Sequence, residues 1–308
     1  MGRLSVTPDR CSRPQTPLAA KLSFIHPRWA REVLFWQFLY RLFAHRLAGG
    51  RTPRDRVALE FAPGVSLRLT SSDAGHLAIR YCGFLEYSLS RRIGRLAAKG
   101  GTFVDVGANY GYFTCLWAAA GPTNRVVAFE PSPRAFVALN ENVSSNQLSD
   151  RVTLCRSALS KEHSIARFVE SPDGQSGLSH LLLDDDPVDT GITIDVTTLD
   201  EFVSKAAAEI SIIDVLKVDA EGVDTWVLYG AENLLREQRI KHLFFEYDQT
   251  LSEPFGITPL EARRFLERWG YEVQRIGRFV WYARVMNRSA GSRSGSPQER
   301  ACPQGPAT

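Results

Sequence analysis

The chain has 308 residues, of which 44% are hydrophobic and 10% aromatic, and this apolar content is enough to bury one enlarged domain or two small ones. The composition therefore excludes a wholly disordered protein. The net charge of +3 is unevenly distributed, because residues 1–56 carry eleven Lys and Arg against three acids, a balance of +8. The remaining residues therefore carry −5, which argues against a nucleic-acid groove as the main surface of that part.

Residues 1–55 are predicted to form a basic, aromatic and helical N-terminal extension. Its first twenty residues lack the apolar run of a secretory signal, so no export is expected. Residues 27–47 have a helical pattern whose longest uncharged run is eight residues, VLFWQFLY, far short of the roughly 20 that a membrane-spanning helix needs. We expect this helix to pack on the domain or on a second subunit. The alternative is peripheral membrane contact, with Trp29, Trp36 and Phe38 in the lipid surface.

Residues 56–286 are predicted to form one α/β domain, because apolar strand-like runs alternate there with helical patterns. Such alternation is typical of a parallel sheet with helices on both faces. The runs are TFVDV (102–106), RVVAFE (125–130), VTLCRSAL (152–159), DVLKVD (214–219) and HLFFEY (242–247).

The end of this domain has a different pattern. The runs YEVQRI and FVWYARV are separated only by Gly277 and Arg278, so a mostly parallel sheet is expected to end in an antiparallel hairpin. Leu159 to Ile194 is read as a loop whose acidic run, residues 184–186, is a solvated turn or a cation site. Residues 287–308, rich in Ser, Gly, Pro and Arg, are predicted to be a disordered tail.

A glycine-rich turn follows the first run, which Asp105 ends. Gly107 and Gly111 allow the backbone to turn tightly and approach a ligand, and a helix from about Tyr112 offers free N–H groups. The dinucleotide fingerprint G-x-G-x-x-G is absent, because no glycine lies three residues after Asn109. The Gly-Lys-Ser/Thr end of a P-loop is absent too.

A turn of the form D-x-G-x-N-x-G suits a ligand with an amino-acid end and a nucleoside end, such as S-adenosylmethionine. Asp105 can accept hydrogen bonds from the ammonium group of this ligand. Glu130, at the end of the second run, can accept from two vicinal ribose hydroxyls. Ser157 and Ala158 are expected to flank the adenine. Glu130 alone also fits an NAD-dependent oxidoreductase, so that alternative stays open.

Three charged residues, Lys217, Asp219 and Glu221, alternate at the end of the fourth run, where a central parallel strand is normally apolar. We place Asp219 and Glu221 beside the transferred group, where they can orient or deprotonate a hydroxyl. Glu246, at the end of the fifth run, reaches the same rim, and either Asp219 or Glu246 is the expected base. The structural alternative is a Lys217–Asp219 ion pair that stabilises the end of the sheet.

Cysteine and histidine usage indicates neither a disulfide framework nor a metal site. The five cysteines include no CxxC pair, and no H-x-x-x-H spacing occurs. This pattern favours a cytoplasmic location, and we expect no metal cofactor.

The motifs GFLEY, DVGANYGYFT, FEPSP, VTTLDEF, LKVDAEGVDTWVLYGA and HLFFEY occur in this order over about 83–246. Together they resemble the FkbM family of S-adenosylmethionine-dependent methyltransferases. The resemblance implies a Rossmann-like class I methyltransferase fold, and most often methylation of a hydroxyl oxygen on a sugar, glycan or polyketide-type natural product.

The resemblance also implies roles for particular residues. The positions that match the cofactor site are Asp105, Gly107, Asn109, Gly111 and Glu130, and the acids of KVDAEG line the reaction centre. Glu86 matches an acid that precedes the glycine-rich turn and can close over the cofactor. The family does not determine the acceptor, and the oligomeric state stays open. A second alternative is a non-catalytic, membrane-associated relative.

Overall fold

The computed structural model describes residues 56–70, 73, 76–170, 179–182, 191–205 and 210–286. The predicted extension at 1–55 with its helix at 27–47, the acidic run at 184–186 and the tail at 287–308 lie outside the described residues.

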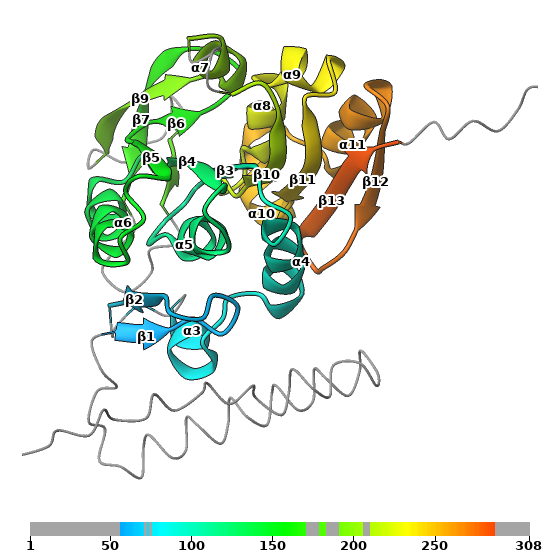
Figure 1. The fold of residues 1–308 in the computed structure, drawn as a ribbon. Helices are drawn as coiled ribbons and strands as arrows, with labels where there is room; N and C mark the ends of the chain where they lie inside the picture. Colours follow the sequence, from blue (N-terminus) through cyan, green and yellow to red (C-terminus); the bar gives the residue numbers. More distant parts are fainter. Residues whose placement is uncertain are drawn as a thin grey trace, which may run out of the picture.

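A seven-stranded sheet forms the centre of the molecule (Figure 1), with the strand order β12-β13-β11-β10-β3-β4-β5. The strands from β11 to β5 are parallel, and β13 runs antiparallel to both of its neighbours. The predicted mostly parallel sheet with a terminal antiparallel hairpin is confirmed, although the last strand lies inside the sheet and β12 forms its edge. The bounds are β3 Thr102–Val106, β4 Arg125–Phe129, β5 Val152–Cys155, β10 Ile213–Val218, β11 Ile240–Glu246, β12 Tyr271–Arg275 and β13 Val280–Val285.

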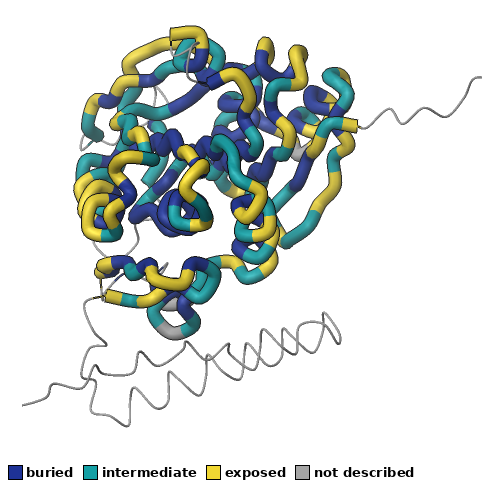
Figure 2. Tube along the Cα trace, in the orientation of Figure 1, coloured by how far each residue is buried: buried dark blue, intermediate teal, exposed yellow. Residues whose placement is uncertain are grey.

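Helices cover both faces of this sheet, as Figure 1 shows. One layer contains α4 (Tyr87–Ala97), α5 (Tyr112–Ala119) and α6 (Pro133–Ser145). The other contains α7 (Leu199–Lys205), α8 (Asp224–Tyr229), α9 (Glu232–Arg236) and α11 (Pro259–Arg268). Successive strand residues face opposite layers, so Phe103 packs in the core of the first and Val104 in the core of the second. Figure 2 shows the burial that results, with the strands buried and the outer helix faces exposed.

Residues 152–159 do not form the single strand that their apolar run predicts. β5 ends at Cys155, and β6 (Ala158–Leu159) belongs to a second sheet with the order β6-β9-β7-β8. This sheet includes β7 (Ser164–Val169), β8 (His180–Leu181) and β9 (Ile192–Thr197), so the expectation of a plain loop from Leu159 to Ile194 is wrong. In β7 the first two side chains are exposed and only Phe168 is buried, so the continuous apolar run that reveals a central strand is missing from it.

A small N-terminal layer lies outside α5 and α6. It consists of the antiparallel pair β1 (Arg56–Ala58) and β2 (Ser66–Arg68) and of α3 (Leu77–Cys82). Asn142 of α6 accepts a hydrogen bond from Arg68 N–H at 2.7 Å, and Asn146, directly after α6, accepts one from Ser66 N–H at 3.0 Å. These two side-chain amides satisfy the backbone N–H groups at the free edge of β2 and so attach the layer to the end of α6. Two short elements, α10 (Gln249–Ser252) and η2 (Glu253–Phe255), connect β11 to α11.

Candidate active site

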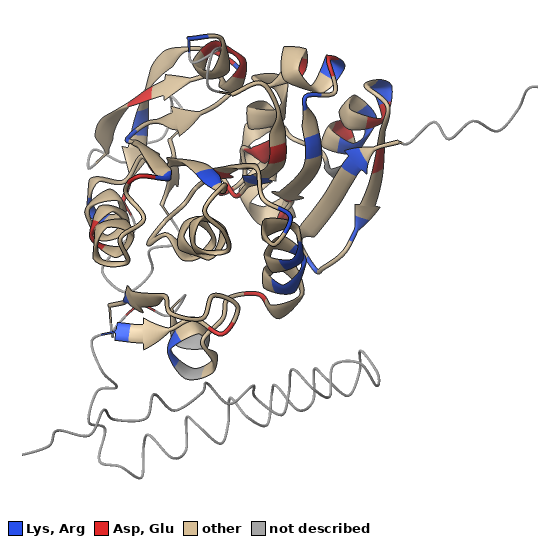
Figure 3. Ribbon diagram, viewed as in Figure 1, with Lys and Arg blue, Asp and Glu red and all other residues tan. Residues whose placement is uncertain are grey.

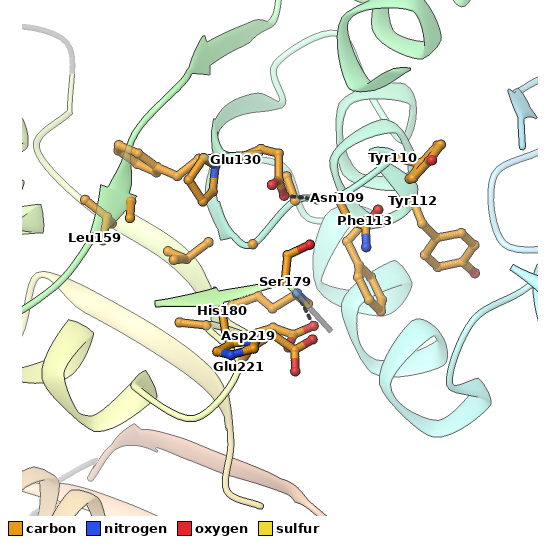
Figure 4. Close-up of a pocket in the computed structure, with 18 of the residues that line it drawn as sticks. Asn109, Tyr110, Tyr112, Phe113, Glu130, Leu159, Ser179, His180, Asp219 and Glu221 are labelled. Atoms are coloured by element: carbon orange, nitrogen blue, oxygen red, sulfur yellow. Dashed lines mark hydrogen bonds and ion pairs between the residues drawn. The ribbon is translucent and has the colours of Figure 1, made fainter. Parts of the chain in front are cut away.

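A cavity of about 240 Å³ opens at the carboxyl ends of β3, β4 and β10 (Figure 4). Parallel strands bring the residues that follow them to one edge of the sheet, and this edge is where ligands bind in such folds. The second sheet and the segment around α3 and α4 contribute the remaining wall. Among the described residues, the wall includes the predicted site residues Glu86, Gly107, Asn109, Glu130, Ser157, Asp219 and Glu221.

The turn after β3 is joined tightly to the end of β10. Gly107 has a φ of 71°, and a Cβ there would lie 2.0 Å from the carbonyl oxygen of Asp219. Only glycine fits such an approach, because any side chain would push the two strand ends apart. The consequence is that the turn and the acids after β10 share one rigid cavity floor.

Gly111 does not line the cavity in the described structure. It precedes α5 with a φ of 87°, and a Cβ there would lie 2.6 Å from Leu139 Cδ1 of α6. Packing between two helices therefore explains this glycine, and a direct contact with a ligand is not needed to account for it.

We expect Gly111→Ala to destabilise the protein by at least about 1–2 kcal/mol, the cost of a left-handed alanine, with the Leu139 contact adding to it. Chemical denaturation measures the loss. Gly94→Ala is the matched control, because a Cβ at Gly94 in α4 meets nothing within 4 Å. This control should be neutral or slightly stabilising. Equal stability of the two variants would contradict the packing explanation.

The Glu130 carboxylate is buried at the cavity wall directly after β4, with 6% of the residue exposed. One oxygen accepts a hydrogen bond from Asn109 N–H at 2.7 Å, and the other accepts one from Ser132 N–H at 3.0 Å. Burial raises the pKa of Glu130 to about 7, and the two N–H donors limit this rise. Asn109 reaches its position through a left-handed backbone with a φ of 49°. The turn therefore fixes the orientation of a carboxylate that still has lone pairs available.

Asp105 lies beneath the cavity floor and is not part of its wall, since only 1% of the residue is exposed. It accepts a hydrogen bond from Thr114 Oγ1 at 2.7 Å, and its other oxygen lies 3.6 Å from Lys217 Nζ. Burial raises the pKa of Asp105, which the Lys217 ammonium partly offsets. Any effect of Asp105 on a ligand must therefore pass through its neighbours.

Lys217 is the buried centre of this charged region. Its ammonium lies 3.2 Å from Asp219 Oδ2, so the ion pair of the structural alternative is present. Burial alone would lower the pKa of Lys217, but Asp219 and Asp105 raise it above its usual value. Lys217 stays charged, and it also faces the cavity together with the half-buried Asp219.

Further carboxyl groups surround this pair. Glu221 lines the cavity, and burial followed by the charge of Asp219 raises its pKa to about 9. Glu246 also has its pKa raised to about 9 by burial and Asp219, but it does not line the cavity. Asp224 is buried and accepts hydrogen bonds from the N–H groups of Glu246 and Ala220, which ties the ends of β11 and β10 together.

Glu86 comes from a different part of the chain, as the residue before α4. Its backbone is left-handed, with a φ of 38°. Its side chain lines the cavity. The surrounding protein partly desolvates the carboxyl group, and this desolvation, followed by the charge of Asp219, raises the pKa of Glu86 to about 7. The fold thus brings an acid from the N-terminal half to the acids after β10.

Sequence reasoning missed the aromatic and histidine part of the wall. Tyr110 lies within the glycine-rich turn and Tyr112 and Phe113 follow it, so their position in the motif was an available signal. His180 comes from the second sheet, and His76 packs edge-on against Tyr110 at a centroid distance of 4.2 Å. No local pattern pointed to these two.

The residues that the structure describes include neither a metal site nor a membrane-spanning helix. In this part of the chain, no group of three His, Cys, Asp or Glu side chains is placed to hold a metal ion. Within the same ranges, no helix is long and apolar enough to cross a bilayer.

The sequence matches a family profile described as Methyltransferase FkbM domain over residues 105–273, more than half of the chain. The comparison with curated proteins gave no significant match. Similar solved structures include an O-methyltransferase from Bacillus cereus in complex with SAH, with 11% identity, a TM-score of 0.37 and coverage of 66% of this chain and 83% of that one.

Two further solved structures are also similar. The SAH-bound methyltransferase of Podospora anserina has 14% identity and a TM-score of 0.37, covering 64% of this chain and 77% of its own. A SAM-dependent O-methyltransferase from Thermotoga maritima has 14% identity and a TM-score of 0.38, covering 67% of each chain. All three TM-scores lie below 0.5, so the family assignment depends on the profile match.

Proposed function

Because this chain belongs to the FkbM methyltransferase family, we propose that it methylates a hydroxyl oxygen of a small-molecule or glycan acceptor, of the sugar or polyketide type. Its methyl donor is S-adenosylmethionine. The family assignment replaces the alternative of an NAD-dependent oxidoreductase. It also disfavours a non-catalytic role, since the cavity retains the acids that such a role would not need.

The residues of the cavity fit S-adenosylmethionine, and Glu130 is the observation on which the proposal rests. Its two oxygens are oriented by backbone N–H groups, and each has a second lone pair for a ribose hydroxyl. Phe129 and Leu159 are apolar residues of the wall near Ser157, as an adenine requires. Glu86, Gly107 and Asn109 would hold the amino-acid end.

The donor supplies a methyl group already activated on a sulfonium, so the protein has to align the acceptor, exclude water and take up one proton. We assign proton transfer to Asp219, which faces the cavity and is held in place by Lys217. Glu221 lies on the same wall and supports it. Glu246 does not reach the wall, so we place it behind Asp219 and Glu221.

We expect Glu130→Ala to weaken S-adenosylmethionine binding at least tenfold, about 1.4 kcal/mol, because the ribose loses its acceptor. Isothermal titration calorimetry measures this affinity. Glu267→Ala is the control, because Glu267 forms only a surface ion pair with Arg263. An unchanged affinity in a folded Glu130→Ala variant would remove the cofactor assignment.

The acceptor class is tested separately, with a labelled methyl donor and a panel of deoxysugar glycosides and hydroxylated polyketides.

We further propose a cytoplasmic location and no nucleic-acid partner. The proposed domain limits are 1–55, 56–286 and 287–308, and residues 27–47 are proposed to make peripheral membrane contact.

A further inference from the structure

One buried ammonium group is surrounded by many carboxyl groups at the reaction end of the cavity. Besides Asp105 and Glu130, Lys217 interacts electrostatically with five acids that we call the carboxyl cluster: Glu86, Asp219, Glu221, Asp224 and Glu246. Lys and Arg are spread over the helices and strand edges of the molecule (Figure 3). Among the described residues of the cavity wall, however, Lys217 is the only one of these two types.

The cluster opens onto a cavity, where Asp219 and Glu221 are half-buried and Glu86 is exposed. Glu86, Asp219 and Glu221 belong to the wall, and Figure 4 shows Asp219 and Glu221 side by side at its lower edge. Beneath them, Asp105 Oδ1 is buried and accepts no hydrogen bond from the described residues. The site thus has more carboxyl groups than its one ammonium group can neutralise, and a cation in the cavity would favour their ionised forms.

Five acids this close cannot all be ionised when the cavity contains no cation. Burial and the charge of Asp219 accordingly raise the pKa of Glu86 to about 7 and that of Glu221 to about 9. A positively charged ligand would lower both pKa values and displace protons. A ligand without this charge at the reaction end would leave the protons in place.

Methyl transfer changes the charge at this point in the cavity. The bond between the methyl carbon and sulfur breaks and its electron pair stays on sulfur, which becomes neutral. A bond between the same carbon and the acceptor oxygen forms, and the hydroxyl proton must leave. One positive charge on sulfur is thereby replaced by one free proton.

We propose that the carboxyl cluster holds the charge of the site constant through the reaction: it gives up protons when the cationic donor binds, and it takes up the hydroxyl proton when the methyl group is transferred. This inference rests on the proposed function. It adds that the site distinguishes the cationic donor from its neutral product by protonation, which favours release of the product.

Other charged and titratable groups also face the cluster, and they must be considered in any pH dependence. They are Asp105 from β3, Glu130 after β4, His180 from β8, Lys217 from β10, Tyr112 from α5 and Asp248 before α10.

The test is the number of protons released on binding, obtained by calorimetry at pH 7 in buffers of different ionisation enthalpy. The ligands are S-adenosylmethionine, its neutral product S-adenosylhomocysteine, and sinefungin, which has an ammonium group in place of the methylsulfonium. We expect the two cationic ligands to release more protons than the product, by about half a proton for a group that titrates near pH 7. Melting temperatures verify that every variant is folded.

Because Glu86 also holds the amino-acid end, we expect the Glu86→Gln/Glu221→Gln double variant to bind the ligands more weakly. At saturating ligand concentrations, most of the difference in proton release should be abolished in it. Glu237→Gln, on an exposed residue that pairs with Arg239, should retain it. Equal proton release for donor and product in the wild-type protein would overturn the inference and leave the proposed function intact. An undiminished difference in the double variant would also overturn it. If none of the ligands binds, the proposed function itself fails.

Discussion

Replacement of Asp219 by Asn should lower turnover by roughly 10² to 10⁴ while cofactor affinity changes little. Asparagine retains the shape of the side chain and removes the base. Asp219 faces the cavity with 31% of its side chain exposed, so the change affects a group that can reach an acceptor. Turnover with any accepted substrate and calorimetric cofactor affinity measure the two effects separately.

Asp150→Asn is the matched control for this prediction, because Asp150 is a surface residue that pairs only with Arg151. Full activity of Asp219→Asn would exclude Asp219 as the base. The role would then move to Glu221, which shares the cavity wall, in preference to Glu246, which does not line it. If Asp219 served only as a partner of Lys217, the variant would lose stability instead of turnover.

Replacement of Lys217 by Met should cost about 3–5 kcal/mol of unfolding free energy, the usual result of breaking a buried ion pair on one side. Lys217 is 4% exposed, and its ammonium lies within 3.6 Å of the buried Asp105. Without it, Asp105 and the surrounding acids lose the positive charge that compensates them. Chemical denaturation at pH 7 measures the loss.

The same variant should show a steeper pH dependence of stability. A carboxyl group whose pKa is raised in the folded protein contributes stability that is present below its unfolded pKa, about 4, and lost as the pH rises through the folded pKa. Removal of Lys217 raises the pKa of Asp105 further, so the loss of stability between pH 4 and 8 should exceed that of the wild type.

Lys241→Met is the control for the ion-pair argument. Lys241 pairs with Asp214 at 2.7 Å, but 54% of its side chain is exposed. Water screens such a pair, so its removal should cost no more than about 1 kcal/mol. A similar small loss in Lys217→Met would contradict the buried-charge argument.

The sequence alone was sufficient to predict the parallel strands of the central sheet and the edge of that sheet where the site lies. Short apolar runs predicted β3, β4, β10 and β11, because a parallel strand that is buried on both faces needs apolar residues on both. An acid directly after such a strand must lie at its carboxyl end. This rule led to Glu130 and Asp219 without any knowledge of their neighbours, and both line the cavity.

The environment of each site residue was decided only by the tertiary structure. Gly111 and Asp105 belong to the same motif as Gly107, but packing against Leu139 and burial beside Lys217 remove them from the cavity wall. The second sheet escaped prediction because its strands are short and partly exposed. The charge state of Glu86 depends on Asp219. The two residues are distant in the sequence, and electrostatic interactions depend on distance in space, which no local pattern encodes.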